Sequence, residues 1–120
     1  MNKWRLPTKE ELNLMYELHK KGIGSFDSGS YWSSSEYSAD YAWSHDFGSG
    51  YQDGDGKYLT LRVRAVRSFE SDKKYKIGET TESGIVFDKN ESEYKECKFE
   101  DEGLYNWYKS MKLFEKKGDL

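Results

Sequence analysis

The segment from Tyr37 to Leu61 holds the densest run of side chains that could bind a partner. Tyrosine, aspartate, serine, glycine and histidine fill most of its positions, and asparagine is absent from it. Tyrosine offers a rigid aromatic contact area, whereas serine, glycine and aspartate offer adaptable hydrogen bonding, and antibody paratopes combine the same residue types. We therefore predict that this segment forms a binding surface for a protein or a carbohydrate.

The Asp-Gly-Asp-Gly sequence at 53–56 is the part of this run that most resembles a metal site, because alternate carboxylates can converge on Ca²⁺. It lacks the later bidentate glutamate of an EF-hand loop, and Asp-Gly repeats are common in turns. His19 and His45 have no partner at the level of motifs, and Cys97 is the single cysteine. We therefore predict no metal, no cofactor and no enzymatic activity.

The composition favours a folded chain and argues against several partners. Aromatic residues make up 17% of the 120 residues, more than a disordered chain of this charge would carry, and the length suits one domain. The net charge of −3 and the lack of a long basic run argue against nucleic acid. No apolar run approaches the roughly 18 residues of a membrane span, and charged residues follow Met1, so we expect neither membrane insertion nor a signal peptide.

The clearest predicted element is a helix that begins after Thr8 and ends before Gly22. Thr8 and Glu11 form a capping box, and the basic pair at 20–21 followed by glycine is a stop signal. Its predicted apolar stripe is Leu12, Met15, Leu18 and His19, widened by Leu14.

The remaining elements predict an α+β fold of two helices with small antiparallel sheets. We expect strands at 31–34, 41–47, 58–69, 85–87 and 94–99, a loop at 48–57, and a second helix at 103–117. In the strand at 41–47, alternation places Trp43, His45 and Phe47 on one face and Ser44 and Asp46 on the other. We expect the tryptophans at positions 4, 32, 43 and 107 to be mostly buried. Structural pairing with acids or aromatic rings is expected for Arg62, Arg64 and Arg67.

Five motifs in order resemble one bacterial family. They are Trp4-Arg5-Leu6-Pro7-Thr8, Glu10-Glu11-Leu12, Tyr31-Trp32-Ser33-Ser34-Ser35-Glu36, Ala42-Trp43 and Arg62-Val63-Arg64-Ala65-Val66-Arg67. This set resembles the C-terminal domain of Legionella collagen-like adhesins, which is similar to the formylglycine-generating-enzyme branch of the C-type lectin fold. The resemblance implies a C-type-lectin-like fold and a place on a cell surface or phage particle. The cysteine chemistry of those enzymes is not implied, because Cys97 is the only cysteine in the sequence.

The rest of the chain resembles the same family in a changed order. The sequences at 75–79 and 84–87 are similar to the segment that opens the family's domain, although here they follow the other motifs. The resemblance therefore implies one circularly permuted domain over 1–120, with a family C-terminal part at 2–70, a connector at 70–74 and a family N-terminal part at 75–120. It predicts that the strand ending near Phe69 lies antiparallel beside the strand at 85–87. The alternative is two half-domains that exchange segments in a homo-oligomer.

Relatives of this family include the variable proteins of diversity-generating retroelements, in which adenine-directed mutagenesis changes Asn codons into codons for the residue types found here. The resemblance implies that the binding positions form one exposed face. These positions are Asp40, Tyr41, Ser44, Asp46, Ser49, Tyr51, Asp53, Asp55 and Tyr58. The alternative function is a structural or assembly domain of an adhesin or phage fibre that has no specific ligand.

Overall fold

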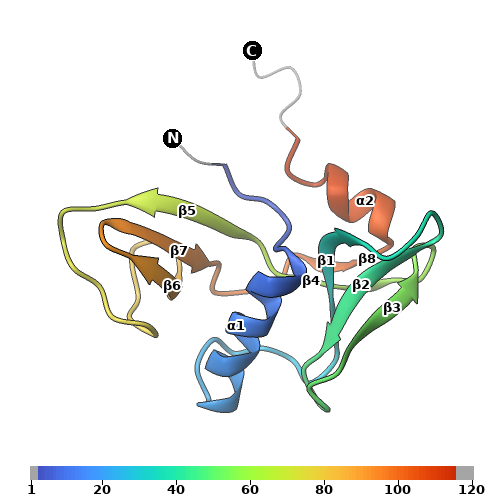
Figure 1. Ribbon diagram of the computed structural model, residues 1–120, viewed down its shortest axis with the longest axis horizontal. Helices are drawn as coiled ribbons and strands as arrows, with labels where there is room; N and C mark the ends of the chain where they lie inside the picture. Colours follow the sequence, from blue (N-terminus) through green and yellow to red (C-terminus); the bar gives the residue numbers. More distant parts are fainter. Residues whose placement is uncertain (1–2, 116–120) are drawn as a thin grey trace.

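The computed structural model describes residues 3–115 and shows an α+β fold with two helices and two small sheets, as the sequence predicts (Figure 1). In chain order the elements are α1 (Lys9–Lys20), β1 (Ser30–Glu36), β2 (Tyr41–Asp46), β3 (Gln52–Gly56), β4 (Leu61–Val63), β5 (Val66–Glu70), β6 (Ile85–Asn90), β7 (Glu93–Cys97), β8 (Gly103–Tyr105) and α2 (Trp107–Lys112). Neither helix in the described part of the chain is long and apolar enough to cross a membrane.

Helix α1 begins and ends where its sequence signals place it. The Thr8 hydroxyl accepts a hydrogen bond from the Glu11 amide, and the Glu11 carboxylate accepts one from the Thr8 amide, so the predicted capping box is confirmed. Gly22 has a φ of +77°, the left-handed backbone that a glycine after a helix supplies without strain. The buried side of the helix carries Glu11, Leu12, Met15 and Leu18.

Helix α1 lies between the two sheets (Figure 1). One sheet has five strands in the order β3-β2-β1-β4-β8, and the other has three in the order β5-β7-β6. All neighbouring strands are antiparallel except β1 and β4, which run parallel. One buried cluster joins α1 to both sheets; it contains Leu12, Met15, Leu18, Phe26, Tyr31, Phe47, Val66, Ile85, Phe87 and Cys97. A second cluster packs α2 on the other face of the five-stranded sheet; it contains Leu6, Trp32, Ala42, Val63 and Trp107.

Three predicted elements have different bounds in the structure. The expected strand at 58–69 is two strands in different sheets, because the chain turns at Arg64-Ala65, whose side chains are buried. The expected loop at 48–57 contains β3, since β2 provides a ladder for this Gly- and Asp-rich segment. The expected helix at 103–117 begins only at Trp107, because residues 103–105 pair with β4, and it already ends at Lys112; positions 116–117 lie outside the described range.

The prediction that the strand ending near Phe69 pairs with the strand at 85–87 is wrong. Both strands lie in the three-stranded sheet, but β7 separates β5 from β6 and is antiparallel to each. Strands β5 and β6 therefore run parallel to each other. The tight turn at 91–92 joins β6 to β7, and this local hairpin takes the place beside β5.

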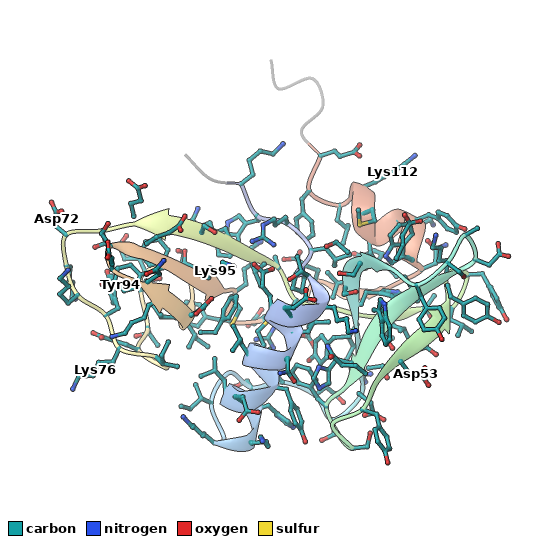
Figure 2. The ribbon with its side chains drawn as sticks, viewed as in Figure 1. Asp53, Asp72, Lys76, Tyr94, Lys95 and Lys112 are labelled. Atoms are coloured by element: carbon teal, nitrogen blue, oxygen red, sulfur yellow. The ribbon has the colours of Figure 1, made fainter. Side chains whose placement is uncertain are left out.

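Charged side chains also lie in the interior, and each is paired. The Glu11 carboxylate accepts two hydrogen bonds from the Arg5 guanidinium, at 2.6 and 2.7 Å. It also lies 2.9 Å from the ammonium of Lys95 on β7 (Lys95 is labelled in Figure 2). Burial opposes this negative charge, but the Arg5, Thr8 and Lys95 hydrogen bonds prevail and lower the pKa of Glu11 to about 2. Arg62 pairs with Asp27, Arg64 with Asp101 and Arg67 with Glu96, so the structural role predicted for these arginines is confirmed.

His45 is a buried base without a partner. Its ring lies 4.9 Å from the Tyr16 ring and 5.1 Å from the Phe47 ring, between centroids, and within residues 3–115 neither ring nitrogen has a hydrogen-bond partner. Burial lowers the pKa of His45 and outweighs the Asp46 carboxylate and the Gly50 backbone, which act in the opposite direction.

We predict from His45 that acid destabilises the fold before the carboxylates titrate. The ordinary pKa of 6.5 applies to the unfolded chain, which therefore binds more protons than the folded chain as the pH falls below that value. The free energy of unfolding should therefore decrease as the pH falls from 7 to 5. Urea unfolding at several pH values measures this slope. The variant His45→Phe should lose this dependence on pH; a flat profile for the parent protein would contradict the prediction.

Candidate binding site

An array of exposed aromatic rings lies at one end of the β2–β3 hairpin. The Tyr37 ring centroid is 4.8 Å from that of Trp43 and 6.4 Å from that of Tyr41. The Lys9 ammonium caps the other side of the array, 3.6 Å from the centroid of Trp43. Trp43 and Trp4 are partly buried, which agrees with the prediction that these rings are mostly buried, but neither belongs to a core cluster.

A concavity of about 380 Å³ adjoins this array, and we call it the tyrosine pocket. It is lined by Asp40, Tyr41, Lys57, Tyr58 and Tyr108. The three tyrosines come from β2, from the turn after β3 and from α2, so three separate segments form its walls. Their exposed fractions are 48% for Tyr41, 79% for Tyr58 and 50% for Tyr108. Rings this exposed contribute little to the core and leave their faces free for contact.

Lys57 holds the segments around the pocket together. Its side chain is 3% exposed, and its ammonium donates to the Glu36 carboxylate at 2.6 Å and to the Ala39 carbonyl at 2.7 Å. The same ammonium lies 4.4 Å from the centroid of the Trp107 ring. The Lys57 amide donates to the Asp40 carbonyl, and the Lys57 carbonyl accepts from the Trp107 amide. One residue thereby fixes the 37–40 loop, the turn after β3 and the start of α2.

Two glycines of β3 make room for the aromatic rings. A methyl group on Gly54 would lie 2.8 Å from the Tyr37 ring, and one on Gly56 would lie 2.7 Å from the Tyr58 ring. Distances this short exclude any larger residue unless the ring moves. The glycines that favour a loop in the sequence therefore serve here as flat strand positions beneath tyrosines.

The nine predicted site residues are divided by the structure. Asp40, Tyr41 and Tyr58 line the tyrosine pocket. Ser49 and Tyr51 are also exposed, but they lie at the opposite end of β3, about 14 Å away at about 3.4 Å per residue. Asp46 is partly buried near the same end, where its carboxylate accepts from the Gly48 amide and shapes the turn.

The remaining three predicted residues lie in the middle of the hairpin. Asp53 is exposed on the edge strand β3 (Figure 2). Asp55 is partly buried, and its carboxylate accepts a hydrogen bond of 2.5 Å from the Ser44 hydroxyl. The predicted exposure of Ser44 is wrong, because its exposed fraction is 3%. Strand alternation correctly placed Ser44 and His45 on opposite faces of β2. Both faces are covered, however, because a core cluster packs on each.

A match to one protein family covers the part of the chain that contains the hairpin. The family described as Lcl C-terminal domain matches the chain over residues 1–67, which include α1, the hairpin and four of the five pocket residues. The chain belongs to the Lcl C-terminal domain family. Membership places it among adhesin-related modules. Neither a curated protein nor a solved structure matches the chain.

Sequence reasoning missed Lys57 and Tyr108 as residues of this Lcl C-terminal domain's pocket. Lys57 is not one of the nine predicted positions, yet it both supports the walls of the pocket and lines it. Tyr108 lies beyond the predicted segment and reaches the pocket only because β8 and the Trp107 amide dock the start of α2 beside the hairpin. No local sequence signal could have placed it there.

Possible metal ligands of this Lcl C-terminal domain are not grouped in the described part, and its cysteine is buried. Among residues 3–115, no three His, Cys, Asp or Glu side chains are grouped as metal ligands. The Cys97 thiol is fully buried, and burial raises its pKa to about 11, so its nucleophilic thiolate is disfavoured.

Proposed function

We propose that this Lcl C-terminal domain is a non-enzymatic recognition module that binds a protein or carbohydrate ligand through the tyrosine pocket. The observation that carries the proposal is the convergence of Tyr41, Tyr58 and Tyr108 from three segments on one concavity. Each exposes about half of its surface or more, although burying an aromatic ring is strongly favourable. Tyrosines in such positions are common at the centres of binding sites, where few residues supply most of the binding energy.

The support beneath the pocket also favours recognition. A binding site loses less entropy when its residues are held in place before the ligand arrives. Lys57 provides this order, because its ammonium and backbone join three segments. The tyrosine rings themselves have few rotatable bonds, so the pocket offers a large contact area at a low cost in conformational entropy.

We also propose that the whole chain is one circularly permuted domain with a C-type-lectin-like fold. The part at 75–115 completes both sheets, since β7 pairs with β5 and β8 pairs with β4. It also supplies Ile85, Phe87 and Cys97 to the cluster around α1. The separation of β5 from β6 by β7 removes one argument for permutation, whereas their common sheet agrees with it.

We further propose that the segment at 37–61 is diversified by a retroelement. Six of the nine proposed positions are exposed, where substitution costs little stability. Ser44 lies outside this set because it is buried. A second copy of the coding segment with Asn codons, beside a reverse transcriptase gene, is the expected genomic evidence. Its absence from a complete genome would contradict this origin without affecting the pocket.

We predict that the double variant Tyr41→Ala/Tyr58→Ala loses ligand binding and keeps its fold. Each exposed ring should change stability by only about 0.5 kcal/mol. Two aromatic contacts of about 1.4 kcal/mol each correspond to a loss of about 100-fold in affinity. Binding is measured on arrays of immobilised glycans and proteins, together with a thermal melt.

The matched control is Tyr51→Ala, because Tyr51 is about as exposed as Tyr58 but lies at the other end of β3. It should bind like the parent protein. An unchanged array pattern for the double variant would refute the pocket as the site. Arrays on which the parent protein binds nothing would instead favour a structural domain of an adhesin or phage fibre.

A further inference from the structure

We infer that the ligand of the tyrosine pocket is a protein surface that inserts an arginine side chain between Tyr41, Tyr58 and Tyr108. The inference rests on the proposed function and gives the ligand its chemistry. It depends on three features of the site, which are its charge, its aromatic walls and the free carboxylate of Asp40.

The exposed charge of the pocket lining is negative. Two of its five residues are charged, Asp40 and Lys57. The Lys57 ammonium is 3% exposed and lies 2.6 Å from the Glu36 carboxylate, so it presents almost no positive charge to a ligand. A site of this sign attracts cationic partners and repels anionic ones, and the attraction also speeds their association. Sulfated or otherwise acidic glycans are therefore disfavoured.

The aromatic walls favour a guanidinium over an ammonium. Arginine is planar, stacks on aromatic faces and is more weakly hydrated than lysine, so it loses less on entering a partly apolar pocket. The molecule itself contains this pairing twice, since the Arg64 guanidinium lies 4.2 Å from the centroid of Phe26 and that of Arg67 lies 4.4 Å from the centroid of Trp4. A concavity of about 380 Å³ can admit one such side chain.

The Asp40 carboxylate is the ion-pair partner that this arginine would meet. Asp40 is exposed at the pocket, and its backbone carbonyl accepts from the Lys57 amide, which fixes the residue in place. Within the described residues, its carboxylate takes part in no hydrogen bond or ion pair. A guanidinium that stacks between tyrosines can donate to both carboxylate oxygens, and charge-assisted bonds of this kind are among the strongest that proteins form.

The test is a titration of the ¹⁵N-labelled protein with short peptides that differ at one residue. The central residue is arginine, citrulline, lysine or glutamate, and citrulline keeps the shape of arginine while removing its charge. A neutral and a sulfated disaccharide complete the set. We expect the arginine peptide to shift the amide signals of Asp40, Tyr41, Tyr58 and Tyr108, and to bind about tenfold more tightly than the citrulline peptide, with lysine between them. The Asp40→Asn variant should lose this tenfold preference, whereas Asp53→Asn, an equally exposed aspartate outside the pocket, should keep it.

The outcomes separate this inference from the proposed function. Equal binding of the arginine and citrulline peptides, or no shift with arginine, would overturn the inference. Pocket shifts with a disaccharide but not with arginine would overturn it too and would leave the tyrosine pocket as a carbohydrate site. If Asp40→Asn disturbs the spectrum of the free protein, Tyr108→Leu tests the same point: it should weaken the arginine peptide about tenfold through the lost stacking surface.

Discussion

Replacing Arg64 by methionine should destabilise the protein by about 3–5 kcal/mol, enough to unfold much of it at physiological temperature. The Arg64 side chain is 1% exposed and uses its guanidinium fully. It donates to the Asp101 carboxylate at 2.8 Å and to the carbonyls of Gly24, Ser25 and Lys98. Methionine fills a similar length but removes the donor of those four acceptors. The partly buried Asp101 carboxylate would keep the Tyr31 hydroxyl but lose its cation, and losing donors to buried acceptors is costly.

The control for this prediction is Arg62→Met. Arg62 also pairs with an aspartate, but the distance to Asp27 is 3.3 Å and the aspartate is about half exposed, so its loss should cost no more than about 1 kcal/mol. Chemical denaturation of both variants measures the difference. If Arg64→Met unfolds at the same denaturant concentration as the parent protein, the interior network of Arg64 does not stabilise the fold.

The second large effect is expected for Trp32→Ala, which should cost about 3–5 kcal/mol. The Trp32 ring is fully buried in the cluster beneath α2, and its indole nitrogen donates to the Tyr105 carbonyl at 2.8 Å. Alanine would therefore leave a cavity and an unpaired carbonyl on β8. Trp43→Ala is the matched comparison, because Trp43 is only partly buried and should lose roughly half as much. Similar melting temperatures for the two variants would contradict the assignment of Trp32 to the core.

Local signals in the sequence predicted the elements that depend on local interactions. The capping box of Thr8 and Glu11 and the glycine at position 22 determine both ends of α1 without help from the rest of the chain. The start of α2 also had such a signal, because the Asn106 side chain accepts from the Lys109 amide as an N-cap. The apolar spacing of Leu104 and Trp107 suggested that the helix begins earlier. Leu104 belongs instead to β8, and its pairing partner β4 is distant in the sequence.

The sequence predicted only part of the candidate site, because local patterns report local interactions. Strand alternation gave the two faces of β2 correctly, but it could not show that Ser44 is covered by a second layer. The segment at 37–61 supplies Asp40, Tyr41, Lys57 and Tyr58, whereas Tyr108 arrives from a distant part of the chain. Long-range docking of this kind leaves no periodic pattern in the sequence, so only the structure could join the fifth residue to the other four.

The placement of β7 between β5 and β6 constrains the order in which the chain can fold. When residues 1–67, the part that matches the family, have left the ribosome, β5 has no ladder partner and α1 lacks Ile85, Phe87 and Cys97 as packing surface. An unpaired strand edge beside an uncovered apolar helix is a template for association with other chains. The family-matched segment made alone should therefore aggregate, and the nascent chain must wait for the hairpin of β6 and β7 before its interior closes.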